Sequence, residues 1–311
     1  MIKEILGKEN LSYEDIVALL QIDVNSEDFY YLLYKSNQYA RTHFSRGYIF
    51  TQIGLNTEPC SGNCKFCSMA RDNYVSEAKW EMSKEELMAR IERTPEYVSD
   101  VFLMTTADYD KEQFLDYCAE ARKRLPEKTR LIANFADFDL DYANKLKEVG
   151  VHGCYHIRRL REGIDTDIDV ETRENTIKAI HEANLELYYC IEPIGKEHTY
   201  SEIAKEILFA KENSVDVMAV MRRVSVNNNF IEGDINLLEV TKIVAVCMLA
   251  VRPKRSMNVH EPNQMSLIAG VNQLYAEEGG NPRDIVTDTS QNRGISVERA
   301  KVLLNEANWK V

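Results

Sequence analysis

Short apolar runs rich in β-branched and aromatic residues alternate with segments of helical periodicity along most of the chain. Such runs predict strands, and the periodic segments between them predict amphipathic helices. The predicted strands are Tyr48–Gly54, Val101–Thr105, Arg130–Phe135, Gly153–Ile157, Leu185–Pro193, Val215–Arg222, Ser256–His260 and Val271–Ala276. The predicted helices are Lys84–Arg93, Lys111–Leu125, Leu140–Val149, Glu171–Ala183, Ser201–Asn213, Asn236–Val251, Gln264–Ala269 and Val297–Ala307.

This alternation predicts an α/β fold, a right-handed TIM-type (βα)8 barrel. The segment before Arg46 reads as two helices, and Ser12 with Asp15 forms a capping box at the start of the first. No low-complexity linker divides the chain. We therefore predict a helical N-terminal extension over residues 1–45 and a barrel domain over residues 46–311. The active site of such a barrel is expected at the C-terminal ends of its strands.

Charge and composition narrow the partners and the compartment. The net charge of −12 argues against nucleic acid, because phosphate contacts need a basic patch. The longest apolar run, Ile243 to Val251, is too short to cross a membrane. The first ten residues lack the apolar stretch of a signal peptide, and the cysteine count of seven is odd. We therefore expect a cytoplasmic protein without membrane or nucleic-acid partners.

Three cysteines, Cys60, Cys64 and Cys67, follow the first predicted strand in a Cys-x3-Cys-x2-Cys arrangement. This spacing allows one loop to place three thiolates on an iron–sulfur cluster. A structural [4Fe–4S] cluster takes four cysteines, so three leave one iron open. An open position distinguishes a catalytic metal site from a closed structural one.

Other interpretations of this loop have less support. A zinc site normally needs a fourth ligand nearby, and the next histidine after Cys67 is His152. A disulfide scaffold does not suit a chain of 311 residues without a secretory segment.

The cysteine loop resembles the signature of the radical S-adenosylmethionine (SAM) superfamily, in which Phe66 matches the aromatic residue before the last cysteine. The helical lead-in, the strand entry at Arg46 to Tyr48 and the eight repeats resemble its biotin synthase-like branch. That branch includes biotin synthase, methylornithine synthase and hydrogenase-cofactor maturases. The resemblance implies a [4Fe–4S] cluster whose open iron binds SAM, and an anaerobic enzyme.

The same resemblance implies reductive cleavage of SAM to a 5′-deoxyadenosyl radical. That radical abstracts hydrogen from a small-molecule or carrier-bound substrate, and a reduced flavodoxin or ferredoxin supplies the electron.

The resemblance also suggests cofactor-binding residues. Arg159 and Glu162, after the fourth strand, are candidates for holding SAM, since arginine binds carboxylates in a bidentate manner. Ile194 and Gly195 match part of an element that packs on adenine. Thr105 and Thr106 lie where relatives bind the SAM amino group, although this match is by position only.

The chain departs from a sulfur-inserting biotin synthase at several strands. Such an enzyme needs further cysteines and an arginine for a second cluster, but Leu103–Asp108 and Leu131–Phe135 carry no thiol. Cys190 falls where one such ligand would be. Cys154, Cys190 and His260 could converge on an auxiliary cluster, or be buried core residues. Cys118 and Cys247 are predicted to be core.

The catalytic candidates are Cys190, Glu192 and His260. Further charges gather at predicted strand ends, and a polar substrate or salt bridges among themselves would satisfy them. These are Arg222, Arg223, Glu261, Glu277, Glu278 and Arg283.

The leading hypothesis is a biotin synthase-like radical SAM transferase that inserts sulfur and so forms a C–S bond. The alternatives within the class are rearrangement or cleavage of a carbon skeleton and maturation of a metal cofactor. A second class is a non-catalytic iron–sulfur electron carrier or sensor, and a third is a zinc-dependent barrel hydrolase.

Overall fold

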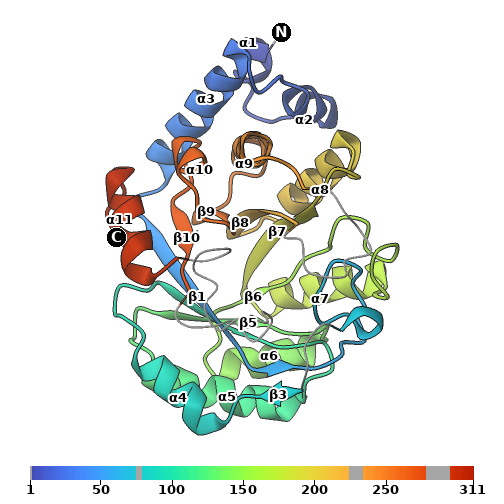
Figure 1. The fold of residues 1–311 in the computed structure, drawn as a ribbon, viewed down its shortest axis with the longest axis vertical. Coiled ribbons are helices and arrows are strands. Elements are labelled where there is room, and N and C mark those ends of the chain that lie inside the picture. Colours follow the sequence, from blue (N-terminus) through green and yellow to red (C-terminus); the bar gives the residue numbers. More distant parts are fainter. Residues whose placement is uncertain (1, 75–78, 224–233, 278–294) are drawn as a thin grey trace.

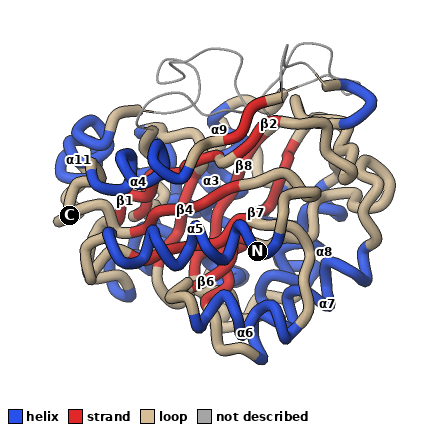
Figure 2. The backbone as a smooth tube through the Cα atoms, turned by 90° about the horizontal axis from the view of Figure 1, so that it is seen from below, coloured by secondary structure: helices blue, strands red, loops and turns tan. Residues whose placement is uncertain are grey.

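The structure of the protein is a computed structural model that describes residues 2–74, 79–223, 234–277 and 295–311. Eight parallel strands close into a barrel in the order β1-β10-β9-β8-β7-β6-β5-β4, with helices around it (Figures 1 and 2). The strands are β1 (Tyr48–Gly54), β4 (Asp100–Met104), β5 (Arg130–Asn134), β6 (Gly153–Tyr155), β7 (Glu186–Ile194), β8 (Val217–Arg222), β9 (Ser256–Val259) and β10 (Gln273–Tyr275). The predicted TIM-type barrel is confirmed.

The barrel helices follow the strands in the predicted alternation. They are α4 (Lys84–Glu92), α5 (Lys111–Arg124), α6 (Leu140–Glu148), α7 (Val170–Glu182), α8 (Tyr200–Glu212), α9 (Leu237–Val251), α10 (Gln264–Ile268) and α11 (Val297–Glu306). Side chains cap most of their first turns, as where Asp169 accepts from Thr172 N at the start of α7. Predicted and observed ends agree within two residues for these strands and helices.

The N-terminal extension contains three helices rather than the predicted two: α1 (Ile2–Ile5), α2 (Tyr13–Leu20) and α3 (Glu27–His43). One helical turn, as in α1, is too short to give a periodic pattern. The capping box of Ser12 and Asp15 is present. The buried ammonium of Lys242 on α9 donates to the carbonyl of Ile22 at 3.0 Å, which ties the extension to the barrel. The domain boundary at residue 45 stays a prediction.

A small antiparallel ribbon was also missed by the sequence patterns. It pairs β2 (Asn56–Thr57) with β3 (Trp80–Glu81), and a short 3-10 turn, η1 (Arg71–Asn73), lies between them in the chain. Two-residue strands carry no readable alternation. The ribbon frames the cysteine loop, which leaves the barrel after β1.

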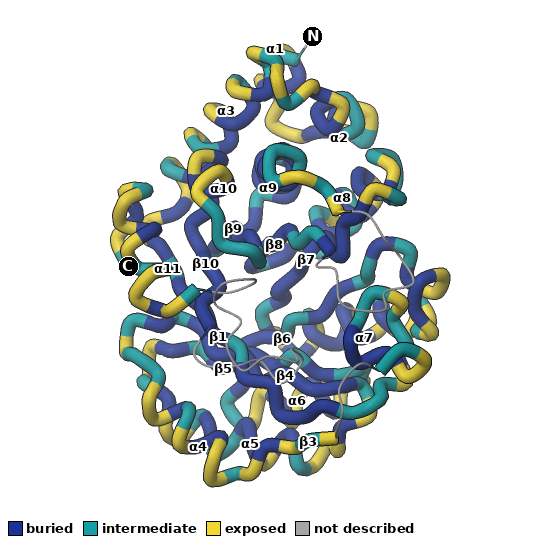
Figure 3. The backbone as a smooth tube through the Cα atoms, viewed as in Figure 1, coloured by how far each residue is buried: buried dark blue, intermediate teal, exposed yellow. Residues whose placement is uncertain are grey.

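A layer of apolar side chains fills the middle of the barrel and forms the floor of its upper half. Its members are Phe50, Phe102, Ile132, Tyr188, Val217 and Tyr275. Side chains two residues further along a strand point to the same side of the sheet. Cys190 on β7 and Gln52 on β1 therefore point into the barrel above this layer. Figure 3 shows the buried barrel strands enclosed by helices with exposed outer faces.

The lower end of the barrel is closed by a buried ion pair. Asp100 is fully buried and accepts hydrogen bonds from Arg255, Tyr188 and Gln273 at 2.7 to 2.9 Å. This ion pair fills the barrel below the aromatic layer, so a functional site is expected at the upper end. Among the described residues, no helix is long and apolar enough to cross a membrane.

Candidate functional site

The three predicted metal ligands lie together in one pocket at the C-terminal ends of the strands. Cys60, Cys64 and Cys67 are half-buried free thiols. Backbone hydrogen bonds shape their loop, including Cys60 N to Met69 O at 2.8 Å and Cys67 N to Cys64 O at 2.9 Å. The pocket is completed by residues that follow β4, β5 and β6, among them Thr105, Thr106, Ala107, Asn134, Tyr155, His156, Arg159 and Arg173.

A second loop, residues 162–168, braces the cysteine loop from outside. Lys65 N donates to Asp165 O at 2.9 Å, and Asp167 N donates to Gly62 O at 2.9 Å. Asn63 also donates to the Asp167 carboxylate at 2.9 Å. The backbone of Asn63 has a φ of 47°, a left-handed conformation that asparagine tolerates. These contacts hold the loop in shape through backbone groups as well as side chains.

Two of the three sulfur atoms accept backbone hydrogen bonds. Ala107 N lies 3.4 Å from Cys60 Sγ, and Met69 N lies 3.4 Å from Cys67 Sγ. Such donors stabilise negative charge on cluster-ligating sulfur and tune a cluster's potential. Burial raises the pKa of Cys64 to about 12, and the charge of Arg159 opposes that rise.

Arg159 places a cation beside the cysteines. Its Nε lies 3.6 Å from Glu192 Oε1, and its Nη1 lies 3.9 Å from Glu162 Oε2. Nη1 is buried and has no hydrogen-bond partner among the residues that the structure describes. Burial acts against the charged form, but Cys64, Glu192 and Glu162 together raise the pKa of Arg159. The guanidinium therefore stays charged.

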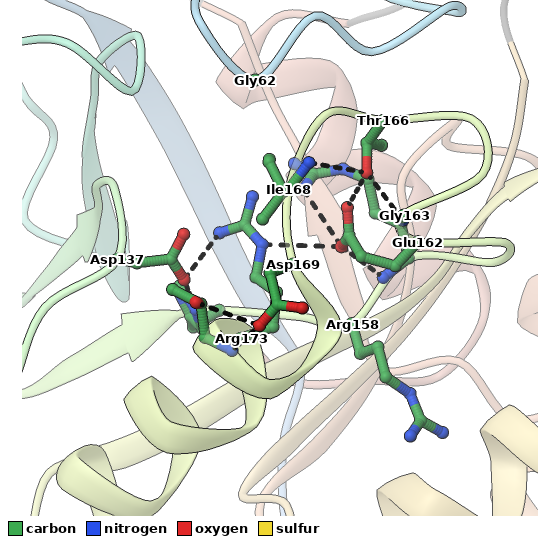
Figure 4. Close-up of polar contacts among 12 residues, drawn as sticks. Gly62, Asp137, Arg158, Glu162, Gly163, Thr166, Ile168, Asp169 and Arg173 are labelled. Atoms are coloured by element: carbon green, nitrogen blue, oxygen red, sulfur yellow. Dashed lines mark hydrogen bonds and ion pairs between the residues drawn. The ribbon is translucent and has the colours of Figure 1, made fainter.

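Glu162 belongs to a network that orders this side of the pocket (Figure 4). It accepts from the hydroxyl of Thr166 at 2.5 Å and from Arg159 N at 3.0 Å. Arg173 lies between two carboxylates, 3.5 Å from Glu162 and 3.2 Å from Asp137, as Figure 4 shows. Glu162 thus holds the loop and the arginines in place, and its cofactor contact stays a prediction.

Asp137 anchors the other end of this network. Its carboxylate lies 3.0 Å from Nε2 of the buried His156. Burial acts against its charge, but the hydrogen bond to His156 and the charges of His156 and Arg173 lower the pKa of Asp137 to about 2. Burial also lowers the pKa of His156.

The remaining cofactor candidates occupy different surroundings. Thr105 and Thr106 line the pocket, and Asn56 binds both the amide and the hydroxyl of Thr106. Phe66 is half-buried on the cysteine loop and is not among the residues that line the pocket. Their contact with SAM stays a prediction.

Ile194 ends β7 and is buried in the core, and Gly195 follows it. A side chain on Gly195 would lie 2.6 Å from Cζ of Arg223, which pairs with Glu197. An arginine–carboxylate pair thus lies against Gly195, and the contact of Ile194 and Gly195 with adenine stays a prediction.

The catalytic candidates lie inside the upper barrel. The hydroxyl of Tyr155 donates to Glu192 Oε2 at 2.8 Å, and Cys190 is fully buried next to both. Burial raises the pKa of Cys190 well above its usual range, so it is a neutral thiol. His260 stacks on Tyr275 at 4.9 Å, and its Nε2 lies 3.4 Å from Gln52 Nε2.

Of the two interpretations of Cys154, the structure fits the buried core residue rather than a partner of Cys190 and His260. Tyr155 packs on the aromatic layer inside the barrel, and adjacent strand residues point to opposite faces. Cys154 therefore points outward, where it lies near Cys118 on α5. Cys118 and Cys247 are fully buried, as predicted.

The strand-end charges are partly satisfied by each other. Arg222 pairs with Glu261, and Arg223 pairs with Glu197. Glu277 is buried, whereas Glu278 and Arg283 lie outside the described residues. Within the described part of the chain, no three His, Cys, Asp or Glu side chains form a group that could hold a single metal ion.

Sequence reasoning missed several residues of the site. Tyr155, Asp137, Arg173, Asp165 and Asp167 gave no motif because their partners are distant in the chain. Strand alternation could have placed Tyr155 inside the barrel. The loop contacts of Asp165 and Asp167 had no such signal.

The barrel and its three-thiol pocket define a (βα)8 protein with a candidate iron–sulfur site, and known proteins are similar to it in sequence and in fold. No family model matches the chain. Biotin synthase from Clostridioides difficile (strain 630) is 24% identical over an alignment of 189 residues, and the alignment covers 58% of this chain and 58% of that protein. The chain thus aligns with less than two thirds of this relative's length.

Solved structures share the whole fold. Methylornithine synthase superposes with a TM-score of 0.83 over 99% of this chain and 96% of that chain, at 16% identity. The FeFe-hydrogenase maturase HydG from Carboxydothermus hydrogenoformans gives a TM-score of 0.80 at 16% identity, over 98% of this chain and 77% of that chain. The chain is thus similar in sequence to biotin synthase, and in fold to methylornithine synthase and HydG, as the cysteine loop and the eight repeats suggested.

The residues of the pocket fit the cofactors that this resemblance implies. One loop brings three thiols into the pocket, and backbone N–H groups lie within 3.4 Å of two of the sulfur atoms. The partnerless Nη1 of Arg159 is a donor suited to an anionic group such as a carboxylate.

Proposed function

We propose that this protein is a radical SAM enzyme. Cys60, Cys64 and Cys67 would hold a [4Fe–4S] cluster, and Arg159 would bind the carboxylate of SAM. When bound, the cluster and SAM supply a one-electron cleavage that allows hydrogen abstraction from a substrate. One observation carries the proposal: three thiols and a buried, uncommitted guanidinium nitrogen meet at the C-terminal end of a barrel.

The chain's own residues orient the cofactors and exclude water. The 162–168 loop holds the cysteine loop, and the Glu162–Arg173–Asp137 network holds the pocket wall. The aromatic layer with Phe50 and Tyr188 closes the barrel below, so a substrate would bind above it. Cys190, Glu192 and His260 are the proposed substrate-facing groups, and excluding solvent protects reactive species there.

Anaerobic reconstitution with iron and sulfide tests the class. We expect about four irons per chain and formation of 5′-deoxyadenosine when SAM and a strong reductant are added. Cys64→Ala should lose the cluster and the product. The matched control is Cys118→Ala, a buried thiol in α5, which should keep both. A loaded and reduced cluster that never yields 5′-deoxyadenosine would instead support the electron-carrier or sensor alternative.

Within this class, we propose C–S bond formation as the first reaction to test, followed by carbon-skeleton rearrangement or cofactor maturation. The support is Cys190, which faces the upper barrel beside Glu192. Against an auxiliary cluster, Cys154 points away from that space. Iron clearly above four per chain, lost in Cys190→Ala, would favour sulfur insertion from a second cluster. A single cluster with a fully active Cys190→Ala would favour the other reactions.

A small-molecule or carrier-bound substrate and a reduced flavodoxin or ferredoxin are the partners that this function implies. Testing each reduced carrier in place of the chemical reductant would identify the electron donor, with 5′-deoxyadenosine as the readout.

A further inference from the structure

Arg159 lies between two carboxylates without a close bond to either. Its nearest approaches are 3.6 Å to Glu192 and 3.9 Å to Glu162, both beyond hydrogen-bond distance. Its Nη1 is buried, and no residue in the described part of the chain forms a hydrogen bond with it. The guanidinium of Arg159 therefore lies near both carboxylates without forming a hydrogen bond to either.

The two carboxylates differ in how firmly they are held. Glu162 is fixed by Thr166, by Arg173 and by the backbone N–H of Arg159. The hydroxyl of Tyr155 donates to Glu192 Oε2 and the Cys190 thiol lies beside the same carboxylate, while Oε1 faces Arg159. Glu192 is also 93% buried, so water competes little for its charge. The strength of its hold on Arg159 therefore depends on Tyr155.

We propose that Glu192 and Tyr155 are positioning residues that control how readily Arg159 binds the carboxylate of SAM. The inference rests on the proposed function and deepens it. An arginine fork that binds one carboxylate in a bidentate manner has fewer donors left for another. Glu192 therefore competes with SAM for Arg159, and the hydrogen bond from Tyr155 weakens that competition.

This arrangement links the SAM site to the substrate site. A substrate that donates an N–H or O–H hydrogen bond to the Glu192 carboxylate weakens the attraction of that carboxylate for Arg159. The guanidinium of Arg159 is then free to bind SAM. Substrate and SAM then favour each other's binding, and the coupling is reciprocal. The arrangement thus selects substrates that carry an amine or hydroxyl near β7.

SAM binding measured without a reductant tests the inference. Cluster-loaded protein is dialysed anaerobically against labelled SAM, so that no turnover occurs. Glu192→Gln should lower the Kd by about fivefold, the scale of a weak coupling. Tyr155→Phe should raise the Kd by a similar factor, because Glu192 then turns fully to Arg159. The double variant should bind like Glu192→Gln alone.

Two controls separate this account from simpler ones. SAM carries a net charge of +1, so the loss of a carboxylate charge from the barrel would by itself weaken SAM binding. Glu261→Gln, in the loop after β9, measures that effect. Glu192→Asp keeps the charge but withdraws it from Arg159, and should also lower the Kd. It replaces Glu192→Gln if that variant does not fold.

A higher Kd for both Glu192 variants, an unchanged Kd for Tyr155→Phe, or additive effects would overturn the inference. Failure of the unaltered, cluster-loaded protein to bind SAM would overturn the proposed function instead.

Discussion

The backbone N–H of Asp167 donates a 2.9 Å hydrogen bond to the carbonyl of Gly62, which joins the loop after β6 to the loop that carries the cysteines. More than 100 residues of chain separate the two. The Asp167 carboxylate strengthens the joint by accepting from Asn63 at 2.9 Å and Arg71 at 3.0 Å. The shape of the cysteine loop therefore depends on a distant segment.

Asp167→Ala should loosen the cysteine loop with little effect on folding. The carboxylate is half-exposed, so its ion pair contributes about 0–1 kcal/mol to the free energy of unfolding. We expect the reconstituted variant to lose iron to a chelator several-fold faster than the unaltered protein. Asp116→Ala, which removes a similarly exposed pair with Lys84, is the matched control. Equal iron loss from both variants would show that the joint does not protect the cluster.

Gly195→Ala should disturb the loop after β7. The new methyl group would press on Arg223, which is 98% buried and cannot move aside freely. Overpacking of this kind costs about 1–3 kcal/mol, measurable by urea unfolding. In Gly7→Ala the closest contact would be an ordinary 3.4 Å, so this control should keep its stability. Equal free energies of unfolding for the two variants would show that the Arg223–Glu197 pair can shift to accommodate the methyl group without loss of stability.

Asp100→Ala should strongly destabilise the barrel. It leaves the guanidinium of Arg255 and the hydroxyl of Tyr188 without their buried acceptor. Breaking a buried pair by removing one partner costs about 3–5 kcal/mol. Urea unfolding with fluorescence detection measures the loss. Lys254→Ala, which removes an exposed pair with Asp216, should cost at most about 1 kcal/mol. Similar losses of unfolding free energy in the two variants would show that the buried Asp100–Arg255 pair does not stabilise the barrel.

The free energy of unfolding should fall as the pH is lowered from about 7 to about 5. Burial, assisted by the charge of Lys254, lowers the pKa of His181 in the folded state. A depressed pKa stabilises the fold above the unfolded value of about 6.5, and this contribution is lost as the pH falls toward the folded value. Burial likewise lowers the pKa values of His152 and His198.

His181→Gln removes one titrating group and should make this pH dependence shallower. Unfolding curves at several pH values compare the two proteins. An identical slope in the variant would show that His181 keeps its ordinary pKa in the folded protein.

The sequence by itself determined the barrel and the position of its cysteines. The strand and helix repeats are local patterns of apolar residues, and a Cys-x3-Cys-x2-Cys loop is a local spacing, so both can be read along the chain. For the same reason α1 and the ribbon of β2 and β3 were missed, since they are too short to carry a pattern.

Only the tertiary structure decided which side chains meet. Tyr155 and Glu192 lie on adjacent strands but 37 residues apart in the chain, and one residue of register decides that Tyr155 faces the barrel interior while Cys154 faces the helices. The tertiary structure also set Arg159 between Glu162 and Glu192, and Gly195 against Arg223. Contacts of this kind depend on strand register and loop packing, which act between segments that no local pattern connects.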